Sequence, residues 1–165
     1  MTVLDVRKDL AARSMTIVAE YPATIARVWR LWADPRQLER WWGPPGCPAT
    51  VTDHDLSAGG RVSYFMTSPE GDRYHGGWRV LRADPPTRLE VEHYFADEAG
   101  GENADMPRSR MVVEIDEAGG GATRMTVTST WESEEAMRKV LEMGMEDGIR
   151  GALGQIEALL AERPE

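Results

Sequence analysis

The sequence has little cysteine, no long apolar run and no excess of positive charge. Cys47 is the single cysteine among 165 residues, which excludes an internal disulfide and a cysteine-based metal cluster. No apolar run approaches the roughly 20 residues that a membrane span needs. Lys and Arg number 19 against 28 Asp and Glu, for a net charge of −9. Because phosphate binding needs clustered basic side chains, nucleic acid is not expected as a main partner.

The motifs of several enzyme classes are also missing. The sequence contains no phosphate-binding loop, no dinucleotide fingerprint and no Gly-x-Ser-x-Gly elbow. Its three histidines, His54, His75 and His93, show no spacing that would bring metal ligands together. Cys47 has no histidine near it in the sequence to activate it as a nucleophile. We therefore predict no metal and no cofactor, and we assign no catalytic residue.

Length and composition predict one domain. A chain of 165 residues with 41% hydrophobic residues is large enough for a single substantial core. Residues 1–13 are mixed and charged and form either an N-terminal extension or a leading strand; residues 14–162 form the domain. Acidic residues near the start and the lack of an apolar segment there argue against a signal peptide. The predicted location is therefore the cytoplasm.

Alternating apolar residues predict most of the domain to be antiparallel sheet. Short turns join the later strands, which indicates a meander. Two short helices follow the first strand: Thr24 is expected to cap residues 25–33, and Asp34 with Pro35 to start the second. The predicted strands span residues 14–21, 49–56, 61–67, 73–82, 88–95, 106–116 and 123–131.

One continuous helix is predicted from Ser133 to Glu162. It would be about 45 Å long, whereas a strand of eight residues spans about 26 Å, so the helix must run past the sheet. The two short helices are the available cover for this overhang. Gly144, Gly148 and Gly151 lower its helix propensity. Gly144, Gly148 and Ala152 lie at four-residue spacing on one stripe, where either another group packs closely or space is left for a ligand.

Three motifs carry a family resemblance: Val28–Pro44, Asp55–Arg61 and Met143–Gly148. They resemble homologues of the activator of heat-shock-protein-90 ATPase, in the START and birch-pollen-allergen-like, polyketide-cyclase-like (SRPBCC) superfamily. The resemblance implies the helix-grip fold, of class α+β. In it, a seven-stranded curved antiparallel sheet wraps around a long C-terminal helix, with two short helices after the first strand. Ile149 departs from the family, where an aromatic residue is common.

The inward faces of the predicted strands combine aromatic and apolar side chains with a few polar groups. This is the composition of a small-molecule pocket, although it also describes a filled core. Of the adjacent pair Trp41 and Trp42, we expect Trp41 to anchor the helix and Trp42 to lean toward the cavity mouth, because neighbours on a helix differ by about 100°. The predicted ligand-binding residues are Trp42, Tyr64, Met66, Trp78, His93, Phe95, Met111, Met125, Ser129, Met145 and Ile149.

The predicted function is binding of a hydrophobic small molecule, lipid or aromatic and polyketide-like, between sheet and C-terminal helix. One alternative is a cyclase or dehydratase that uses His93, Tyr64 or Tyr74 in the same cavity. Another is a co-chaperone-like interaction domain, implied by the family name, with the acidic loop 96–105 as its surface. The expected partner is thus a small molecule, with no nucleic acid and no membrane span, and a homodimer is left open.

Overall fold

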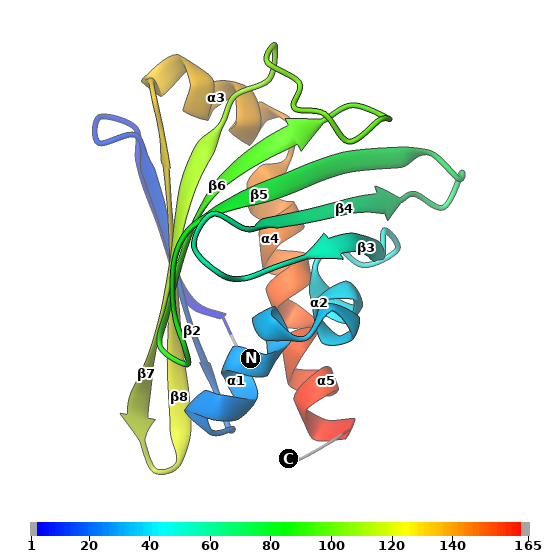
Figure 1. Cartoon of the computed structure of the whole chain (residues 1–165). Helices are drawn as coiled ribbons and strands as arrows, with labels where there is room; N and C mark the ends of the chain where they lie inside the picture. Colours follow the sequence, from blue (N-terminus) through cyan, green and yellow to red (C-terminus); the bar gives the residue numbers. More distant parts are fainter. Residues whose placement is uncertain (1–2, 163–165) are drawn as a thin grey trace.

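The sheet is curved, and it bends around the C-terminal helices (Figure 1). The computed structural model describes residues 3–162, and within them eight antiparallel strands lie in the order β1-β2-β8-β7-β6-β5-β4-β3. The strands are β1 Val3–Asp9, β2 Ser14–Tyr21, β3 Ala49–His54, β4 Arg61–Thr67, β5 Arg73–Asp84, β6 Arg88–Ala96, β7 Ser109–Gly119 and β8 Ala122–Trp131. The helices are α1 Ile25–Ala33, α2 Pro35–Trp41, α3 Glu134–Glu142, α4 Met145–Gly154 and α5 Ile156–Glu162.

This is the predicted α+β helix-grip architecture with one strand more than the seven expected. The eighth strand is β1, which pairs with β2 along the edge of the sheet. Of the two alternatives for residues 1–13, the leading strand is therefore correct. Its sequence alternates weakly, because an edge strand can carry charged side chains such as Arg7 and Lys8 that face solvent.

The short helices begin where their capping residues predict. The Thr24 hydroxyl accepts a hydrogen bond from the Arg27 N–H at 3.1 Å, and the Asp34 carboxylate accepts one from the Arg36 N–H at 2.9 Å. Pro35 occupies the first turn of α2, where its missing N–H has no intrahelical partner to lose. Both caps satisfy N–H groups that the first helical turn would leave unpaired.

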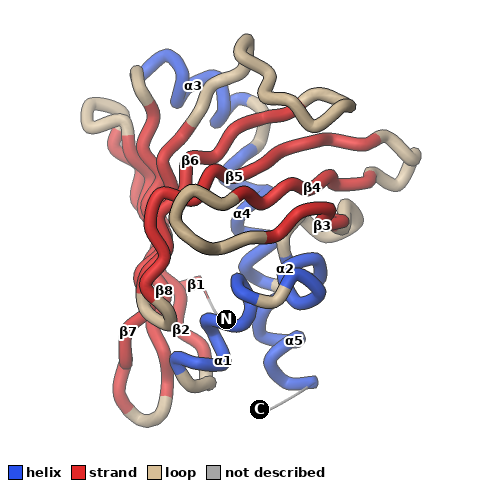
Figure 2. The backbone as a smooth tube through the Cα atoms, in the orientation of Figure 1, coloured by secondary structure: helices blue, strands red, loops and turns tan. Residues whose placement is uncertain are grey.

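The predicted single C-terminal helix is wrong in one respect: the structure divides it. Gly144 adopts a left-handed φ of 88°, and its N–H bonds to the Leu141 carbonyl, so α3 ends there and α4 starts in a new direction. A smaller irregularity at Gln155 separates α4 from α5. α3 therefore lies across one end of the sheet, α4 runs along its concave side, and α5 continues from α4 beside α2 (Figures 1 and 2).

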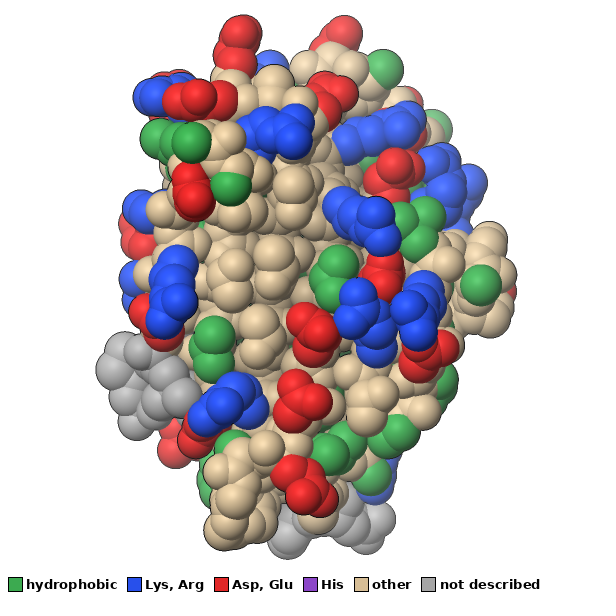
Figure 3. Space-filling model, turned by 90° about the vertical axis from the view of Figure 1, so that its left-hand side faces the viewer, with side chains coloured by type: hydrophobic (Ala, Val, Ile, Leu, Met, Phe, Trp, Pro, Cys, Tyr) green, Lys and Arg blue, Asp and Glu red, His purple; other side chains and the backbone are tan. Residues whose placement is uncertain are grey.

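The two faces of the sheet have opposite character. The concave face and the helices share one hydrophobic core. The outer face carries interspersed acidic and basic side chains (Figure 3). On it, the buried Glu90 carboxylate pairs with Arg110 and Arg88, and these arginines lower the pKa of Glu90.

Among residues 3–162, no helix is long and apolar enough to cross a membrane.

As predicted, one of the two short helices covers the end of the C-terminal helices that runs past the sheet. α2 packs against α5. The Gln155 side-chain amide donates to the backbone carbonyls of Trp41 and Gly43, the latter at 2.8 Å. The stretch around the paired tryptophans is therefore a structural cradle that connects the first strands to the last helices.

Candidate functional site

A cavity of about 250 Å³ lies between the concave sheet and α4. Its volume is several times the roughly 30 Å³ share of one liquid water molecule. The wall is formed by Met15, Ile17, Trp42, Gly43, Pro44, Tyr64, Met66, Tyr74, His75, His93, Phe95, Ser109, Met111, Val127, Ser129, Val140, Met143, Gly144, Met145, Gly148, Ile149 and Ala152. None of these is Lys, Arg, Asp or Glu, and five are methionines.

The structure brings nine of the eleven residues predicted from the sequence onto this wall. They are Trp42, Tyr64, Met66, His93, Phe95, Met111, Ser129, Met145 and Ile149. The other two, Trp78 and Met125, lie outside the wall and are almost completely buried in the core. Strand alternation identifies the face on which a residue lies, but not how far along the strand the cavity extends. That any of these residues contacts a ligand stays a prediction.

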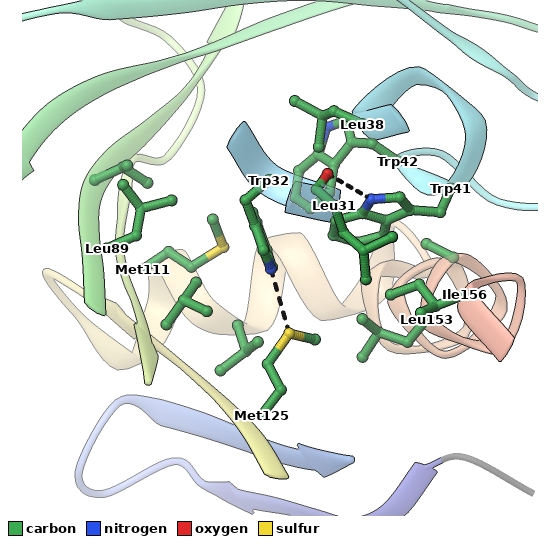
Figure 4. Close-up of a cluster of buried hydrophobic side chains, with 14 of the residues drawn as sticks. Leu31, Trp32, Leu38, Trp41, Trp42, Leu89, Met111, Met125, Leu153 and Ile156 are labelled. Atoms are coloured by element: carbon green, nitrogen blue, oxygen red, sulfur yellow. Dashed lines mark hydrogen bonds between the residues drawn. The ribbon is translucent and has the colours of Figure 1, made fainter. Parts of the chain in front are cut away.

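Behind the cavity lies an aromatic layer, the packed rings of Trp32, Trp41, Trp42 and Trp78, and Met125 contacts it. The Trp32 ring lies 4.7 Å from Trp41 and 5.7 Å from Trp78, measured between ring centroids. The Trp32 indole N–H donates to the Met125 sulfur at 3.3 Å (Figure 4). The layer thus forms a rigid wall of tilted and edge-to-face rings.

Trp41 and Trp42 divide their roles in this layer. Trp41 is fully buried, and its indole N–H donates to the Leu31 carbonyl at 2.9 Å (Figure 4). Trp42 lines the cavity, with its ring 5.0 Å from Trp78 and 5.9 Å from Tyr64. The indole N–H groups of Trp42 and Trp78 are the buried side-chain polar atoms of the described residues that lack a hydrogen-bond partner.

Tyr64 and His93 form the polar pair of the cavity wall. The Tyr64 hydroxyl lies 2.8 Å from His93 Nε2. His93 is half-buried because part of its ring borders the cavity, and the surrounding apolar groups lower its pKa to about 4. Burial likewise raises the pKa of Tyr64, although the Trp42 indole acts against this shift. Both groups are therefore neutral at pH 7.

Glycines decide the shape of the wall in two different ways. A Cβ at Gly148 would meet nothing within 4 Å, so this glycine leaves the α4 side of the cavity open. A Cβ at Gly151 would come within 2.7 Å of Pro45 Cδ, so this glycine allows close packing of α4 on the Gly-Pro-Pro-Gly segment. Of the two explanations left open for the stripe that includes Gly148, open space therefore applies at Gly148, and the close packing occurs at Gly151, outside that stripe.

The cavity opens beside the break between α3 and α4. Met143 and Tyr74 line it and are 54% and 59% exposed. The contribution of Met15 and Ile17 from β2 to this wall was missed. The alternation of β2 places both residues inward, and this signal could have added them to the predicted site.

Metal binding receives no support from the histidines. Among residues 3–162, no group of three or more His, Cys, Asp or Glu side chains is arranged to hold a metal ion. His54 instead places Nε2 2.9 Å from the Trp32 carbonyl, which ties β3 to α1. It therefore serves the structure of the cradle.

Comparison with known proteins agrees with this architecture. The model of the family described as Activator of Hsp90 ATPase homolog 1-like protein matches residues 22–161. The chain belongs to this family. By its fold, it belongs with the SRPBCC superfamily. No curated protein matches the chain.

Solved structures of similar proteins have the same fold over nearly the whole chain. Protein Ms6760 of Mycobacterium smegmatis is 47% identical, with a TM-score of 0.89 and coverage of 96% of both chains. A protein from Arthrobacter aurescens is also 47% identical, with a TM-score of 0.93 and coverage of 98% of this chain and 93% of that one. A protein from Staphylococcus epidermidis is 26% identical, with a TM-score of 0.83 and coverage of 98% and 96%.

Proposed function

We propose that this protein binds a hydrophobic small molecule in the cavity between the sheet and α4, and that it does so in the cytoplasm. The observation that carries the proposal is the cavity itself: an uncharged wall of aromatic and methionine side chains around about 250 Å³. Ligand pockets of this kind are mostly apolar with a few placed polar groups. Because methionine side chains are flexible and polarizable, the wall can adapt to more than one ligand shape.

The absence of charge from the wall restricts the ligand. An ion placed there would lose its hydration without gaining an opposite charge, which is strongly unfavourable. The lining side chains that could make hydrogen bonds, such as Tyr64, Ser109 and Ser129, are neutral. The cavity therefore suits an uncharged lipid-like or aromatic molecule.

Native mass spectrometry of the purified protein tests this proposal. We expect an added mass that organic solvent removes. Gly148→Leu would place a side chain in the cavity and should abolish the added mass. Gly154→Leu is the matched control, because Gly154 is in the same helix, is exposed and does not line the cavity. Retention of the ligand by the Gly148→Leu protein would refute the cavity as the binding site.

The Tyr64–His93 hydrogen bond favours one second candidate, a cyclase or dehydratase that moves a proton in the same cavity. Binding without chemistry is the stronger proposal, because the described wall offers no carboxylate to orient the imidazole. If substrate screening finds a turnover, His93→Ala should abolish it; unchanged turnover would remove His93 from the mechanism. A co-chaperone role and a homodimer stay predictions, since no contact of the described residues favours either.

A further inference from the structure

Two buried serines of the cavity wall have hydroxyl groups without a partner. Ser109 and Ser129 are 9% and 5% exposed, and their side chains make no hydrogen bond with any of residues 3–162. The other buried serine and threonine are paired: the Ser68 hydroxyl accepts from a backbone N–H at 3.1 Å, and the Thr123 hydroxyl donates to a backbone carbonyl at 2.6 Å. Because most buried polar groups are paired, the two exceptions indicate a partner that comes from outside the chain.

Both hydroxyl groups open onto the cavity. Ser109 and Ser129 line it, and neither oxygen is among the completely enclosed atoms without a partner. Within the described residues, those enclosed atoms are the indole nitrogens of Trp42 and Trp78, which nothing in the cavity can reach. The serine oxygens differ from them because a ligand or water in the cavity can bond to them.

His93 extends the two serines into a row across three adjacent strands. It lies opposite Ser109 in the pairing of β6 with β7, and Ser129 of β8 lies opposite Met111, two residues beyond Ser109. Opposite side chains on one face of a sheet are close neighbours, and diagonal ones are about 7–8 Å apart. Since neighbouring strands are about 4.8 Å apart, His93, Ser109 and Ser129 form a polar stripe about 10 Å long on the cavity wall.

His93 contributes a hydrogen-bond donor to this polar stripe. Burial raises the pKa of Tyr64, whereas the Trp42 indole N–H, which is directed at the Tyr64 oxygen, lowers it. Because that oxygen faces a donor already, its own O–H is best used on His93 Nε2, 2.8 Å away. Neutral His93 then carries its proton on Nδ1. Nδ1 makes no hydrogen bond with a described residue and is not enclosed, so its N–H is available to the cavity that the ring lines.

The polar stripe and the rest of the wall require different things of a ligand. The His93 N–H needs an acceptor, and the two serine hydroxyls can each donate or accept. A hydrocarbon chain would leave all three unpaired, and an acid would find no cation on the wall to balance its charge. A rigid ring system holds two oxygens at a fixed separation, whereas a flexible chain would lose rotational freedom on binding.

We propose that the cavity selects uncharged aromatic molecules with two oxygen groups at opposite ends, an acceptor that bonds to His93 and a second oxygen that bonds to Ser109 or Ser129. This inference rests on the proposed binding function and narrows its ligand class from hydrophobic molecules in general to oxygenated aromatic ones. The apolar faces of the ring system contact the methionine and aromatic side chains of the wall.

Three neutral probes of similar shape test the proposal by isothermal titration calorimetry with the full chain. They are 6-acetyl-2-naphthol, with an oxygen at each end, 2-acetylnaphthalene, with one oxygen, and 2-ethylnaphthalene, with none. We expect each oxygen to tighten binding about threefold to tenfold, as one net hydrogen bond allows.

Matched variants then locate the recognition on the polar stripe. The double variant Ser109→Ala, Ser129→Ala should weaken binding of 6-acetyl-2-naphthol about threefold or more and change binding of 2-ethylnaphthalene by less than twofold. His93→Phe should remove the advantage of 2-acetylnaphthalene over 2-ethylnaphthalene. Ser68→Ala is the control, because Ser68 is also a buried serine but is paired and does not line the cavity. It should change none of the affinities.

Thermal unfolding without ligand gives a second readout. The double serine variant loses no hydrogen bond within the described structure, so its melting temperature should equal or exceed that of the wild type. Ser68→Ala loses the bond to the Asp72 N–H and should melt at a lower temperature. A lower melting temperature for the double variant would show that the two hydroxyls serve the fold and not a ligand.

The outcomes distinguish failure of the binding function from failure of the polar stripe. If none of the probes binds and native mass spectrometry also finds no ligand, the binding function fails, and this inference fails with it. If the three probes bind equally, or if the double serine variant weakens all three to the same extent, binding stands and recognition by the polar stripe is refuted. Water then satisfies the hydroxyls. A retained ligand whose exact mass corresponds to fewer than two oxygen atoms refutes it as well.

Discussion

Tyr64 reaches His93 across an intervening strand because Gly76 has no side chain. Tyr64 is in β4 and His93 in β6, with β5 between them, and the two side chains meet at 2.8 Å. A Cβ at Gly76 would come within 2.6 Å of the Tyr64 hydroxyl oxygen. The neighbouring Gly77 accommodates Tyr94 in the same way, at 2.5 Å from its hydroxyl. The Gly76 and Gly77 pair within β5 therefore leaves room for two tyrosine side chains.

Substitution of Gly76 should break this contact. In Gly76→Ala the new methyl group displaces Tyr64, and we expect a loss of about 1–3 kcal/mol in the free energy of unfolding. Urea denaturation measures the loss. Gly77→Ala is the matched control, since it displaces Tyr94 and should destabilise the protein comparably. Only Gly76→Ala should shift the His93 ring resonances in NMR spectra; an equal shift in both variants would contradict the contact.

His93 should make stability depend on mildly acidic pH. Its pKa is about 4 in the folded protein, below the ordinary value of 6.5, because burial disfavours the charged ring. Between these two values the unfolded chain binds a proton that the folded chain does not. The contribution of neutral His93 to the free energy of unfolding is therefore complete above about pH 6.5. It declines as the pH falls toward 4, by at most about 3 kcal/mol.

The comparison of the wild type with His93→Gln isolates that contribution, because acidic residues titrate equally in both proteins. Between pH 7 and pH 5, the unfolding free energy of the wild type, measured in urea, should fall by more than that of the variant. An unchanged difference would show that the ring titrates normally. An NMR titration of the ring protons gives the pKa directly.

Local signals in the sequence predicted where helices start better than where a helix breaks. The capping groups of Thr24 and Asp34 act within one turn of chain, and each is found as expected. The break at Gly144 was missed, because the apolar stripe continues through it and a helix tolerates glycine at moderate loss of stability. Whether a glycine bends the chain there depends on what α3 and α4 pack against, which is tertiary information.

The candidate site shows the same limit. Alternation put Tyr64 and His93 on the inward face, yet nothing in the sequence pairs them, since their contact depends on the register of β5 and the missing side chain of Gly76. Trp78 shares their face but lies deeper, behind Trp42. Strand alternation tells on which face of the sheet a side chain lies, but not how deeply it is buried. It therefore identifies the wall without marking where the core ends and the cavity starts.

The glycines of α4 should respond oppositely to alanine. Gly148→Ala gains helix propensity, and its methyl group enters open space, so we expect stabilisation of up to about 1 kcal/mol. Gly151→Ala brings a methyl group within 2.7 Å of Pro45, and the stiff ring cannot yield easily, so we expect destabilisation of about 1–3 kcal/mol. Thermal unfolding of the two variants checks the sign; destabilisation by Gly148→Ala would mean that the cavity collapses around this position.

Gln155 should contribute more to stability than the ion pair that joins the same two elements. Its amide donates to the carbonyls of Trp41 and Gly43, which lie at and just beyond the end of α2, so Gln155→Ala removes both bonds and should cost about 1–2 kcal/mol. Arg40 pairs with Glu162 nearby, but both side chains are about half exposed. Water and salt screen such a pair, so Arg40→Ala should change stability by less than about 0.5 kcal/mol. Urea denaturation at low and high salt checks both: the Gln155 effect should not depend on salt, and a larger loss for Arg40→Ala would show that the exposed pair, rather than the amide, holds the cradle to the C-terminal arm.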